Sequence, residues 1–137
     1  DLFTYLTDSK VTKIEAQALH PTDSYYSAQD NFFCTLSFED GSVATLQYTA
    51  MGSKEYPKEK MEVFVEGLVI ALDDYRGTRI YGAKTKGLDT KMIEKGHFEE
   101  LHHFAKAIRG REPWPNPLWQ QVQAMEIAYK VDSLIKG

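Results

Sequence analysis

The fold of this chain is decided by a stretch that reads Asn31-Phe-Phe-Cys-Thr-Leu-Ser-Phe38, Glu39-Asp-Gly-Ser42 and Val43-Ala-Thr-Leu-Gln-Tyr-Thr49. Along both outer segments the side chains alternate with a period of two, which is the period of a β-strand. The Asp-Gly pair between them indicates a hairpin, because a tight turn requires a positive φ that glycine adopts freely. An isolated hairpin is only marginally stable in water, so we expect these strands to belong to a larger sheet.

Further strands and three helices are predicted on both sides of this hairpin. Alternating or short apolar runs occur over residues 11–19, 61–66, 68–72 and 78–81, with a second tight turn at Glu66-Gly67. Apolar residues at helical spacing occur over residues 2–6, over 97–109 and from Asn116-Pro117 onward. Strands followed by helices are typical of the α+β class, so we predict an open, mostly antiparallel sheet with helices packed on one face.

The last predicted helix carries a wide apolar face. Its stripe and the residues that widen it are Leu118, Val122, Met125, Tyr129, Ile127, Val131 and Leu134. A face of this width predicts packing against the sheet. Both alternating sets of strand residues contain apolar side chains, so the sequence leaves open which set faces away from the helices. Either choice leaves apolar groups uncovered, and we expect a symmetric homodimer through the open sheet face to cover them.

Composition narrows the class of protein. A length of 137 residues predicts one domain, and a net charge of −4 argues against nucleic acid and against an anionic membrane as partners. Cys34 is the only cysteine, which is compatible with a reducing compartment, and we predict a cytoplasmic location. Its place within an alternating strand predicts a small buried core residue. The sequence shows neither an apolar run of membrane-span length nor a signal-peptide pattern.

The short motifs of cofactor and nucleophile chemistry are missing from the sequence, namely G-x-G-x-x-G, the phosphate-binding P-loop and G-x-S-x-G. A cluster of histidines and glutamates occurs over residues 97–103, where Glu99 stands three and four positions before His102 and His103. A metal site would need a second ligand pair, so we predict no metal and interpret the cluster as a solvated helix face with a local Glu–His pair. A further hypothesis, which the sequence favours least, is a small metalloenzyme built on this cluster.

The loop over residues 50–60 is the candidate for substrate contacts. A charged loop is most often simply solvated. The Tyr56-Pro57 pair restricts the backbone, however, and ordered polar loops between strands are where ligand contacts concentrate. We therefore predict that Lys54, Tyr56 and Lys58 contact a substrate. No residue of the chain is predicted to be catalytic, to bind a cofactor or to ligate a metal.

Five motifs occur in order and at fitting spacing along the chain: Phe38-Glu-Asp-Gly-Ser42, Gly52 through Glu59, Val63-Phe-Val-Glu-Gly67, Leu72-Asp-Asp74 and Lys95-Gly-His-Phe-Glu-Glu100. Each motif is weak alone, but the ordered set resembles the C-terminal domain of the glucose–fructose oxidoreductase / inositol dehydrogenase / MocA-type (Gfo/Idh/MocA) family. The resemblance covers nearly the whole chain, from Leu2 to Gly137. It implies that residues 1–137 are a single C-terminal domain, for substrate binding and oligomerisation, from a longer chain.

The resemblance also implies what the chain lacks. The family consists of two-domain NAD(P)-dependent oxidoreductases that act mostly on sugars, cyclitols and sugar nucleotides, and a Rossmann domain precedes this one. Asp1 resembles the aspartate of the family's His-x-x-Asp pattern, which would place the catalytic histidine before the first residue. On this basis we expect the full-length protein to bind NAD or NADP. We expect this piece alone neither to bind the cofactor nor to catalyse a reaction.

Two hypotheses about function remain at this stage. The first is the substrate-binding and dimerisation domain of an NAD(P)-dependent dehydrogenase that acts on a sugar-like substrate. The second is a stand-alone, non-catalytic binding or scaffolding module with the same fold. The segment after Asp1 reads as the last turns of a helix cut open, which favours the first hypothesis, and the gene sequence upstream of Asp1 separates the two.

Overall fold

The structure is a computed structural model that describes residues 1–22, 24–90 and 92–136. It contains two antiparallel three-stranded sheets and three α-helices, so the predicted α+β class is confirmed. The chain divides into two compact units, Asp1–Gly52 with Asn116–Gly137 and Ser53–Pro115. Each unit contains one of the two sheets.

The first sheet lies in the first unit and contains the hairpin that the sequence predicts. Its strands are β1 (Val11–Ala18), β2 (Asn31–Phe38) and β3 (Val43–Thr49), in the order β1-β2-β3. Between β2 and β3 the backbone N–H of Gly41 donates to the carbonyl of Phe38 at 3.1 Å, and Gly41 has φ 88°. A turn closed by a left-handed glycine matches the twist of the two strands, which is why the Asp-Gly pair predicted it correctly.

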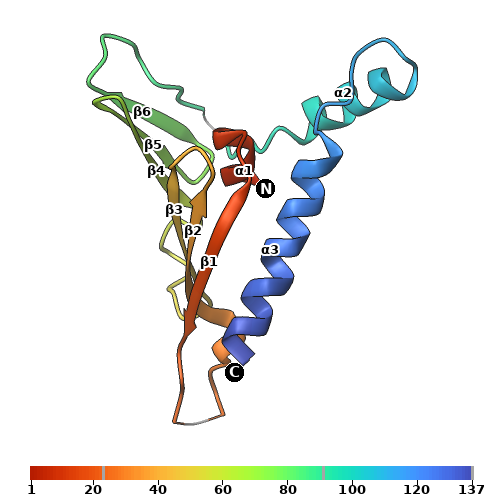
Figure 1. Cartoon of the computed structure of the whole chain (residues 1–137). Coiled ribbons are helices and arrows are strands. Elements are labelled where there is room, and N and C mark those ends of the chain that lie inside the picture. Colours follow the sequence, from red (N-terminus) through yellow and green to blue (C-terminus); the bar gives the residue numbers. More distant parts are fainter. Residues whose placement is uncertain (23, 91, 137) are drawn as a thin grey trace. The chain divides into compact units, whose positions relative to one another are not determined.

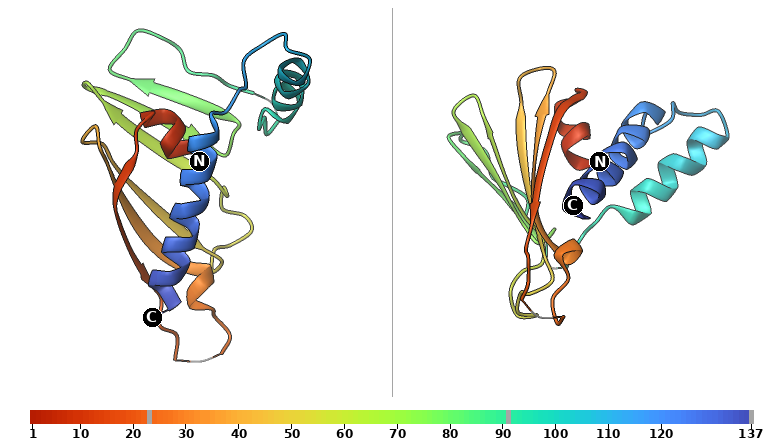
Figure 2. Two further views of the ribbon diagram at one scale, coloured as in Figure 1. Left: turned by 45° about the vertical axis from the view of Figure 1, so that its right-hand side comes forward. Right: turned by 60° about the horizontal axis from the view of Figure 1, so that its bottom comes forward.

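The helix α3 (Leu118–Lys136) covers one face of the first sheet, as Figures 1 and 2 show. Cys34 of β2 and Val131 and Ile135 of α3 form the buried core of this layer. The strand residues packed around them include Ile14, Ala16, Ala18 and Phe32. The alternating set that contains Cys34 therefore faces the helix. Phe33 and Val43 belong to the other set and are exposed.

The prediction for the buried face of α3 was wrong in part. Of the predicted stripe and its flank, Val131 is buried and Ile127 is half-buried. The other five are exposed, at 72% for Leu118, 46% for Val122, 53% for Met125, 69% for Tyr129 and 38% for Leu134. The sheet-facing side instead begins with Gln120 and Gln123, which are buried. The first two turns of α3 bury polar side chains, so a count of apolar residues selects the wrong side of the helix in those turns.

These two glutamines are buried because they bind the N-terminal segment. The Gln123 amide donates to Thr4 Oγ1 at 3.0 Å and to the Ser9 carbonyl at 3.1 Å, and its oxygen accepts from the Val11 N–H at 2.9 Å. Gln120 Nε2 donates to Asp8 Oδ1 at 3.0 Å. Thr4 lies in α1 (Leu2–Thr7), which ends at Asp8 in the left-handed conformation. The contacts thus join α1 and the start of β1 to α3.

The second unit contains the second sheet, formed by β4 (Lys60–Val65), β5 (Leu68–Asp73) and β6 (Gly77–Tyr81) in the order β4-β5-β6. Glu66 and Gly67 both have positive φ, 48° and 79°, and form the two-residue turn predicted between β4 and β5. The turn between β5 and β6 also uses the left-handed region, at Asp74 and Tyr75.

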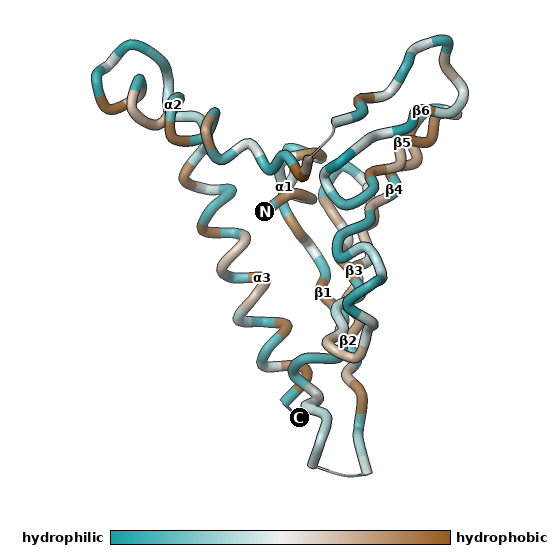
Figure 3. Tube along the Cα trace, turned by 180° about the vertical axis from the view of Figure 1, so that it is seen from behind, coloured by the Kyte–Doolittle hydropathy of each residue, from teal (hydrophilic) through white to brown (hydrophobic). Residues whose placement is uncertain are grey.

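The helix α2 (His97–Ile108) also lies in the second unit, and none of its residues is buried. Its apolar side chains are exposed, at 75% for Phe98, 69% for Leu101 and 65% for Ile108, and hydrophobic segments recur along it in Figure 3. Gly110 follows with φ 67° and donates its N–H to the Ala107 carbonyl, as expected of a glycine that ends a helix.

Candidate functional site

The loop between β3 and β4 carries the three residues predicted to contact a substrate. In its turn, Tyr56 N–H donates to the Ser53 carbonyl at 3.1 Å and Glu55 N–H donates to Ser53 Oγ at 3.2 Å. The turn leaves Lys54, Tyr56 and Lys58 exposed, with 64% of Tyr56 accessible. The backbone therefore turns at Ser53 and presents the three side chains to solvent.

A fourth residue joins this group. Lys60, the first residue of β4, places Nζ 4.6 Å from the centre of the Tyr56 ring, within the range of a cation–π interaction. Lys60 ends the charged loop of residues 50–60 but was not among the predicted substrate contacts, although a lysine four positions after a tyrosine in a lysine-rich loop was a visible signal. Among the described residues, no ion pair is recorded for Lys54, Lys58 or Lys60. This segment thus presents three exposed lysines, of which Lys60 lies over the Tyr56 ring.

One of the two carboxylates in this loop, that of Glu59, is already paired. Lys95 Nζ donates to Glu59 Oε1 at 2.5 Å and lies 5.0 Å from the centre of the Tyr75 ring. The hydrogen bond to Glu59 raises the pKa of the Lys95 ammonium. The Asp74 N–H also donates to the Glu59 carbonyl at 2.7 Å. The end of the loop is therefore fixed to the turn after β5, and Glu59 is matched by Lys95 rather than by the lysines beside Tyr56.

This arrangement suits a ligand that combines an anionic group with a sugar ring. Ammonium groups attract phosphate or carboxylate oxygens, and the exposed face of a tyrosine ring packs against apolar ligand surface while its hydroxyl can hydrogen-bond. Residues 50–60 include no histidine and no cysteine, so this loop offers neither a carboxylate–histidine pair nor a thiolate nucleophile.

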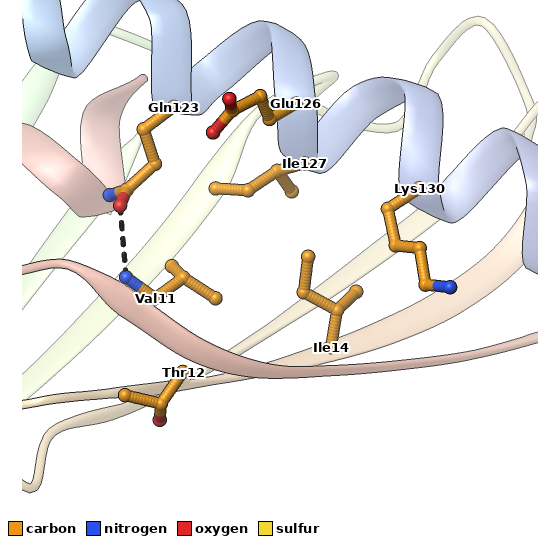
Figure 4. Close-up of a pocket in the computed structure, with 7 residues that line it drawn as sticks. All are labelled: Val11, Thr12, Ile14, Gln123, Glu126, Ile127 and Lys130. Carbon is orange, nitrogen blue, oxygen red and sulfur yellow. Dashed lines mark hydrogen bonds between the residues drawn. The ribbon is translucent and has the colours of Figure 1, made fainter.

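A groove lies between α3 and β1 in the first unit, with a volume of about 300 Å³. Figure 4 shows Ile14 and Ile127 pointing toward one another across it, with Gln123 bonded to the Val11 backbone at one end. Its wall also includes Thr12, Glu126 and Lys130. Apolar packing side chains and a satisfied glutamine line this groove, so it lacks a convergent set of reactive groups.

In the histidine cluster of α2, His103 pairs with Glu112 rather than with the predicted partner Glu99. His103 Nδ1 lies 2.7 Å from Glu112 Oε2, and Lys106 Nζ donates to Glu112 Oε1 at 2.5 Å. These hydrogen bonds, that of Lys106 foremost, hold the pKa of the Glu112 carboxyl below its usual range. Within residues 1–22, 24–90 and 92–136, no group of three or more His, Cys, Asp and Glu side chains could hold a metal ion.

We compared the sequence and the fold with those of known proteins. No protein-family model matches the sequence, and no curated protein matches it at a significant level. Among solved structures, UDP-N-acetylglucosamine 3-dehydrogenase GnnA from Acidithiobacillus ferrooxidans aligns with 98% of the chain at a TM-score of 0.73 and 18% identity. A Thermotoga maritima protein described as an oxidoreductase aligns with 98% at 0.72 and 16%. WlbA dehydrogenase from Bordetella pertussis, solved with NADH and UDP-GlcNAcA, aligns with 98% at 0.57 and 14%.

The chain has the fold of a part of Gfo/Idh/MocA-type oxidoreductases. The resemblance that the sequence motifs carry is therefore confirmed at the level of the fold. The chain spans only 44%, 41% and 39% of the lengths of the three solved structures. In the part of the chain that the structure describes, no helix is both long enough and apolar enough to cross a bilayer.

Proposed function

We propose that this chain is the substrate-binding and dimerisation domain of an NAD(P)-dependent oxidoreductase that acts on a sugar, a cyclitol or a sugar nucleotide. The observation that carries the proposal is the alignment of 98% of the chain with less than half of each dehydrogenase structure. One of those proteins is named for a UDP-N-acetylglucosamine dehydrogenase activity, and another was solved with NADH and UDP-GlcNAcA. A sugar nucleotide combines the anionic group and the ring that the loop around Tyr56 suits.

In this proposal Lys54, Tyr56 and Lys58 contact the substrate, and Lys60 holds the Tyr56 ring in place through its ammonium group. The three lysines give the loop positive charge that attracts the diphosphate of a sugar nucleotide. The ring of Tyr56, being largely exposed, is free to pack against a sugar. These residues bind and orient, and catalysis belongs to the rest of the oxidoreductase.

The described residues do not fit a nicotinamide dinucleotide. Such cofactors bind where a glycine-rich turn joins a strand to a helix in a parallel βαβ unit. Both sheets here are antiparallel, and α2 follows β6 only after residues 82–96. We therefore assign no step of hydride transfer to this chain and place NAD or NADP in the full-length protein. The cytoplasmic location and the homodimer remain parts of the proposal.

Titration of the 137-residue chain followed by two-dimensional NMR tests the proposal. With UDP-N-acetylglucosamine at millimolar concentration, we expect shifts that centre on residues 53–60, and no shifts with NADH or NADPH. Lys54→Ala with Lys58→Ala should abolish the sugar-nucleotide response. Lys86→Ala, which removes an exposed lysine from another loop, should leave it unchanged.

Three outcomes would contradict the proposal. Micromolar binding of NADH or NADPH to the chain would place the cofactor site here. Shifts that persist in the double-alanine variant would place the substrate elsewhere. A start codon or a linker directly upstream of Asp1 in the gene, in place of a glycine-rich βα turn and a histidine, would favour the stand-alone binding or scaffolding module.

A further inference from the structure

The carboxylate of Glu59 would cancel part of the positive charge of the candidate site if it were free. Lys58 precedes it and Lys60 follows it in the sequence. Charges on neighbouring side chains lie within roughly one Debye length of each other, about 8 Å at physiological salt, so a free carboxylate at Glu59 would attract both ammonium groups. A phosphate ligand would then compete with Glu59 for these lysines. The loop therefore binds an anion best when Glu59 is occupied elsewhere.

Lys95 occupies Glu59 from a position 36 residues further along the chain. Its Nζ donates to Glu59 Oε1 at 2.5 Å, and the side chains of Lys95 and Glu59 are 36% and 34% exposed. The same ammonium group lies 5.0 Å from the centre of the Tyr75 ring, which is a second attractive contact. Because the hydrogen bond to Glu59 raises the pKa of Lys95, this lysine is charged at neutral pH. The ion pair therefore neutralises Glu59 under the conditions in which a ligand would bind.

The backbone on each side of this ion pair has a contact of its own. Asp74 N–H donates to the Glu59 carbonyl at 2.7 Å, and Glu94 N–H donates to the Tyr75 carbonyl at 2.9 Å. Both segments are thus attached to the turn between β5 and β6, and the path of the loop does not depend on the ion pair alone. Among the described residues, the Lys95 ammonium is the one recorded partner of the Glu59 carboxylate. The particular effect of Lys95 is therefore on the position of that carboxylate.

Two other acidic residues lie near the lysines and are not paired with them. Glu55 belongs to the same loop and is exposed, and Asp73 lies opposite Lys60 in the register of β4 and β5. In the part of the chain that the structure describes, no ion pair is recorded for either carboxylate. Lys60 instead directs its ammonium group to the Tyr56 ring. Of the two glutamates in residues 50–60, Glu59 is the one that a distant lysine draws away from the loop's own lysines.

We propose that Lys95 is a positioning residue for substrate binding, and that it acts by holding the Glu59 carboxylate away from the lysines of the loop. In this role Lys95 does not contact the ligand. With Glu59 neutralised, Lys54 and Lys58 keep their charge for the diphosphate of a sugar nucleotide. The inference rests on the proposed function and adds to it a residue from outside the loop.

Titration with UDP-N-acetylglucosamine, followed by two-dimensional NMR of the 137-residue chain, tests the proposal in three variants. Lys95→Met frees Glu59 and should weaken binding at residues 53–60 by at least about threefold. Glu59→Gln removes the competing carboxylate and should bind at least as tightly as the parent. The variant that combines both changes should bind within about twofold of the parent, because no carboxylate remains at position 59 to compete. Recovery on removal of the partner is a readout that a merely structural ion pair would not produce.

Matched controls separate the charge of Lys95 from its place in the chain. Lys95→Arg keeps the charge and should bind like the parent. Lys86→Met removes an exposed lysine from the same connection between β6 and α2, and should change the affinity by less than about twofold. In about 0.5 M sodium chloride the loss caused by Lys95→Met should shrink, since salt screens the attraction of Glu59 for the loop lysines. Circular dichroism checks the fold of every variant, and Lys95→Gln replaces Lys95→Met if the latter fails this check.

Three results would overturn the inference while leaving the proposed substrate in place. Equal affinity of the parent and Lys95→Met for the sugar nucleotide would show that Glu59 does not compete for the lysines. A combined variant as weak as Lys95→Met would indicate that Lys95 contacts the ligand directly. Weaker binding by Glu59→Gln than by the parent would indicate that the ion pair serves to hold the loop in place.

Inorganic pyrophosphate is titrated in parallel, because it carries a diphosphate without a sugar. If pyrophosphate gives the expected order of the variants and UDP-N-acetylglucosamine gives no shifts, the role of Lys95 is supported and the substrate class of the proposed function is overturned. If neither probe shifts residues 53–60 of the parent, both the role of Lys95 and substrate contact by this loop are overturned.

Discussion

The two three-stranded sheets are built alike and buried differently. Both are antiparallel meanders whose turns use left-handed residues, at Gly41 in the first and at Glu66-Gly67 in the second. The first sheet has α3 on one face and contributes to a core in which Cys34, Leu36 and Phe38 are at most 4% exposed. In the second unit, no described residue is buried. Strand pairing alone therefore does not make a core, and a helix packed on the sheet does.

This difference indicates which unit contributes most to stability. Burial of apolar side chains is the main favourable term in folding, so the first unit should carry most of the free energy of unfolding. The second sheet keeps apolar and aromatic side chains accessible, such as Phe64 and Tyr81. Exposed apolar patches of this kind mark interaction surfaces in folded proteins. The contrast can be tested by substitutions matched between buried and exposed positions.

The largest effect is expected from a charge placed under α3. Val131→Asp would bury an unpaired carboxylate at a position that is 6% exposed, and should lower the free energy of unfolding by about 4 kcal/mol. Met125→Asp introduces the same group on the outer side of the same helix, at 53% exposure, and should cost less than about 1 kcal/mol. Urea denaturation measures both. Equal losses in the two variants would contradict the orientation of α3.

The burial of Val131 and the exposure of Met125 show the limits of prediction from the sequence. Alternation and turn residues correctly located the hairpin around Gly41 and the last helix, because these signals are local. Which side of α3 is buried depends on Gln120 and Gln123, whose partners Asp8 and Thr4 lie 112 and 119 residues away in the sequence. Hydrogen bonds over such separations make polar residues suitable for burial, and a hydrophobic pattern does not record them.

For the candidate site the sequence predicted a loop, and substrate contact by the residues of that loop stays a prediction. Loop position and composition located Lys54, Tyr56 and Lys58, and the structure shows all three exposed in the loop between β3 and β4. The pairing of Glu59 with Lys95 spans 36 residues and depends on how the segment before α2 returns to the second sheet. Such a contact follows from the folded path of the chain, so its residues could not be matched from spacing alone.

An intermediate effect is expected at the polar end of the α3 contact. Gln123→Ala removes three hydrogen bonds, two of them buried, and takes this partner from the half-buried Val11 N–H and the buried Ser9 carbonyl, which should cost about 2–3 kcal/mol in urea denaturation. Gln121→Ala is the matched control, since Gln121 is exposed and makes one hydrogen bond to the Asn116 carbonyl. Its loss should stay below about 0.5 kcal/mol. A neutral Gln123→Ala would mean that these buried contacts do not hold α1 to α3.

The smallest effects are expected from pH, and they should have opposite signs in the two units. In the first unit Asp40 accepts hydrogen bonds from the backbone and side chain of Ser42, foremost the backbone, which lower the pKa of its carboxyl. Its contribution to stability is present above the ordinary pKa of an aspartate and is lost as pH falls through the lowered value. In the second unit the pKa of Lys95 is raised by Glu59, so its contribution is present below the ordinary pKa of a lysine and is lost as pH rises through the raised value.

Denaturation midpoints measured from acid to alkaline pH, for the parent chain and for Asp40→Asn and Lys95→Met, check both signs. From neutral pH downward the difference between the parent and Asp40→Asn should shrink, and from neutral pH upward the difference between the parent and Lys95→Met should shrink. Both groups are at the surface, so added salt should reduce the Lys95 difference because ions screen its attraction to Glu59. The Asp40 difference should depend less on salt, because hydrogen bonds within its own turn lower its pKa. A Lys95 difference that stayed constant as pH rose into the alkaline range would show that the charge of Lys95 does not hold the segment before α2 through Glu59.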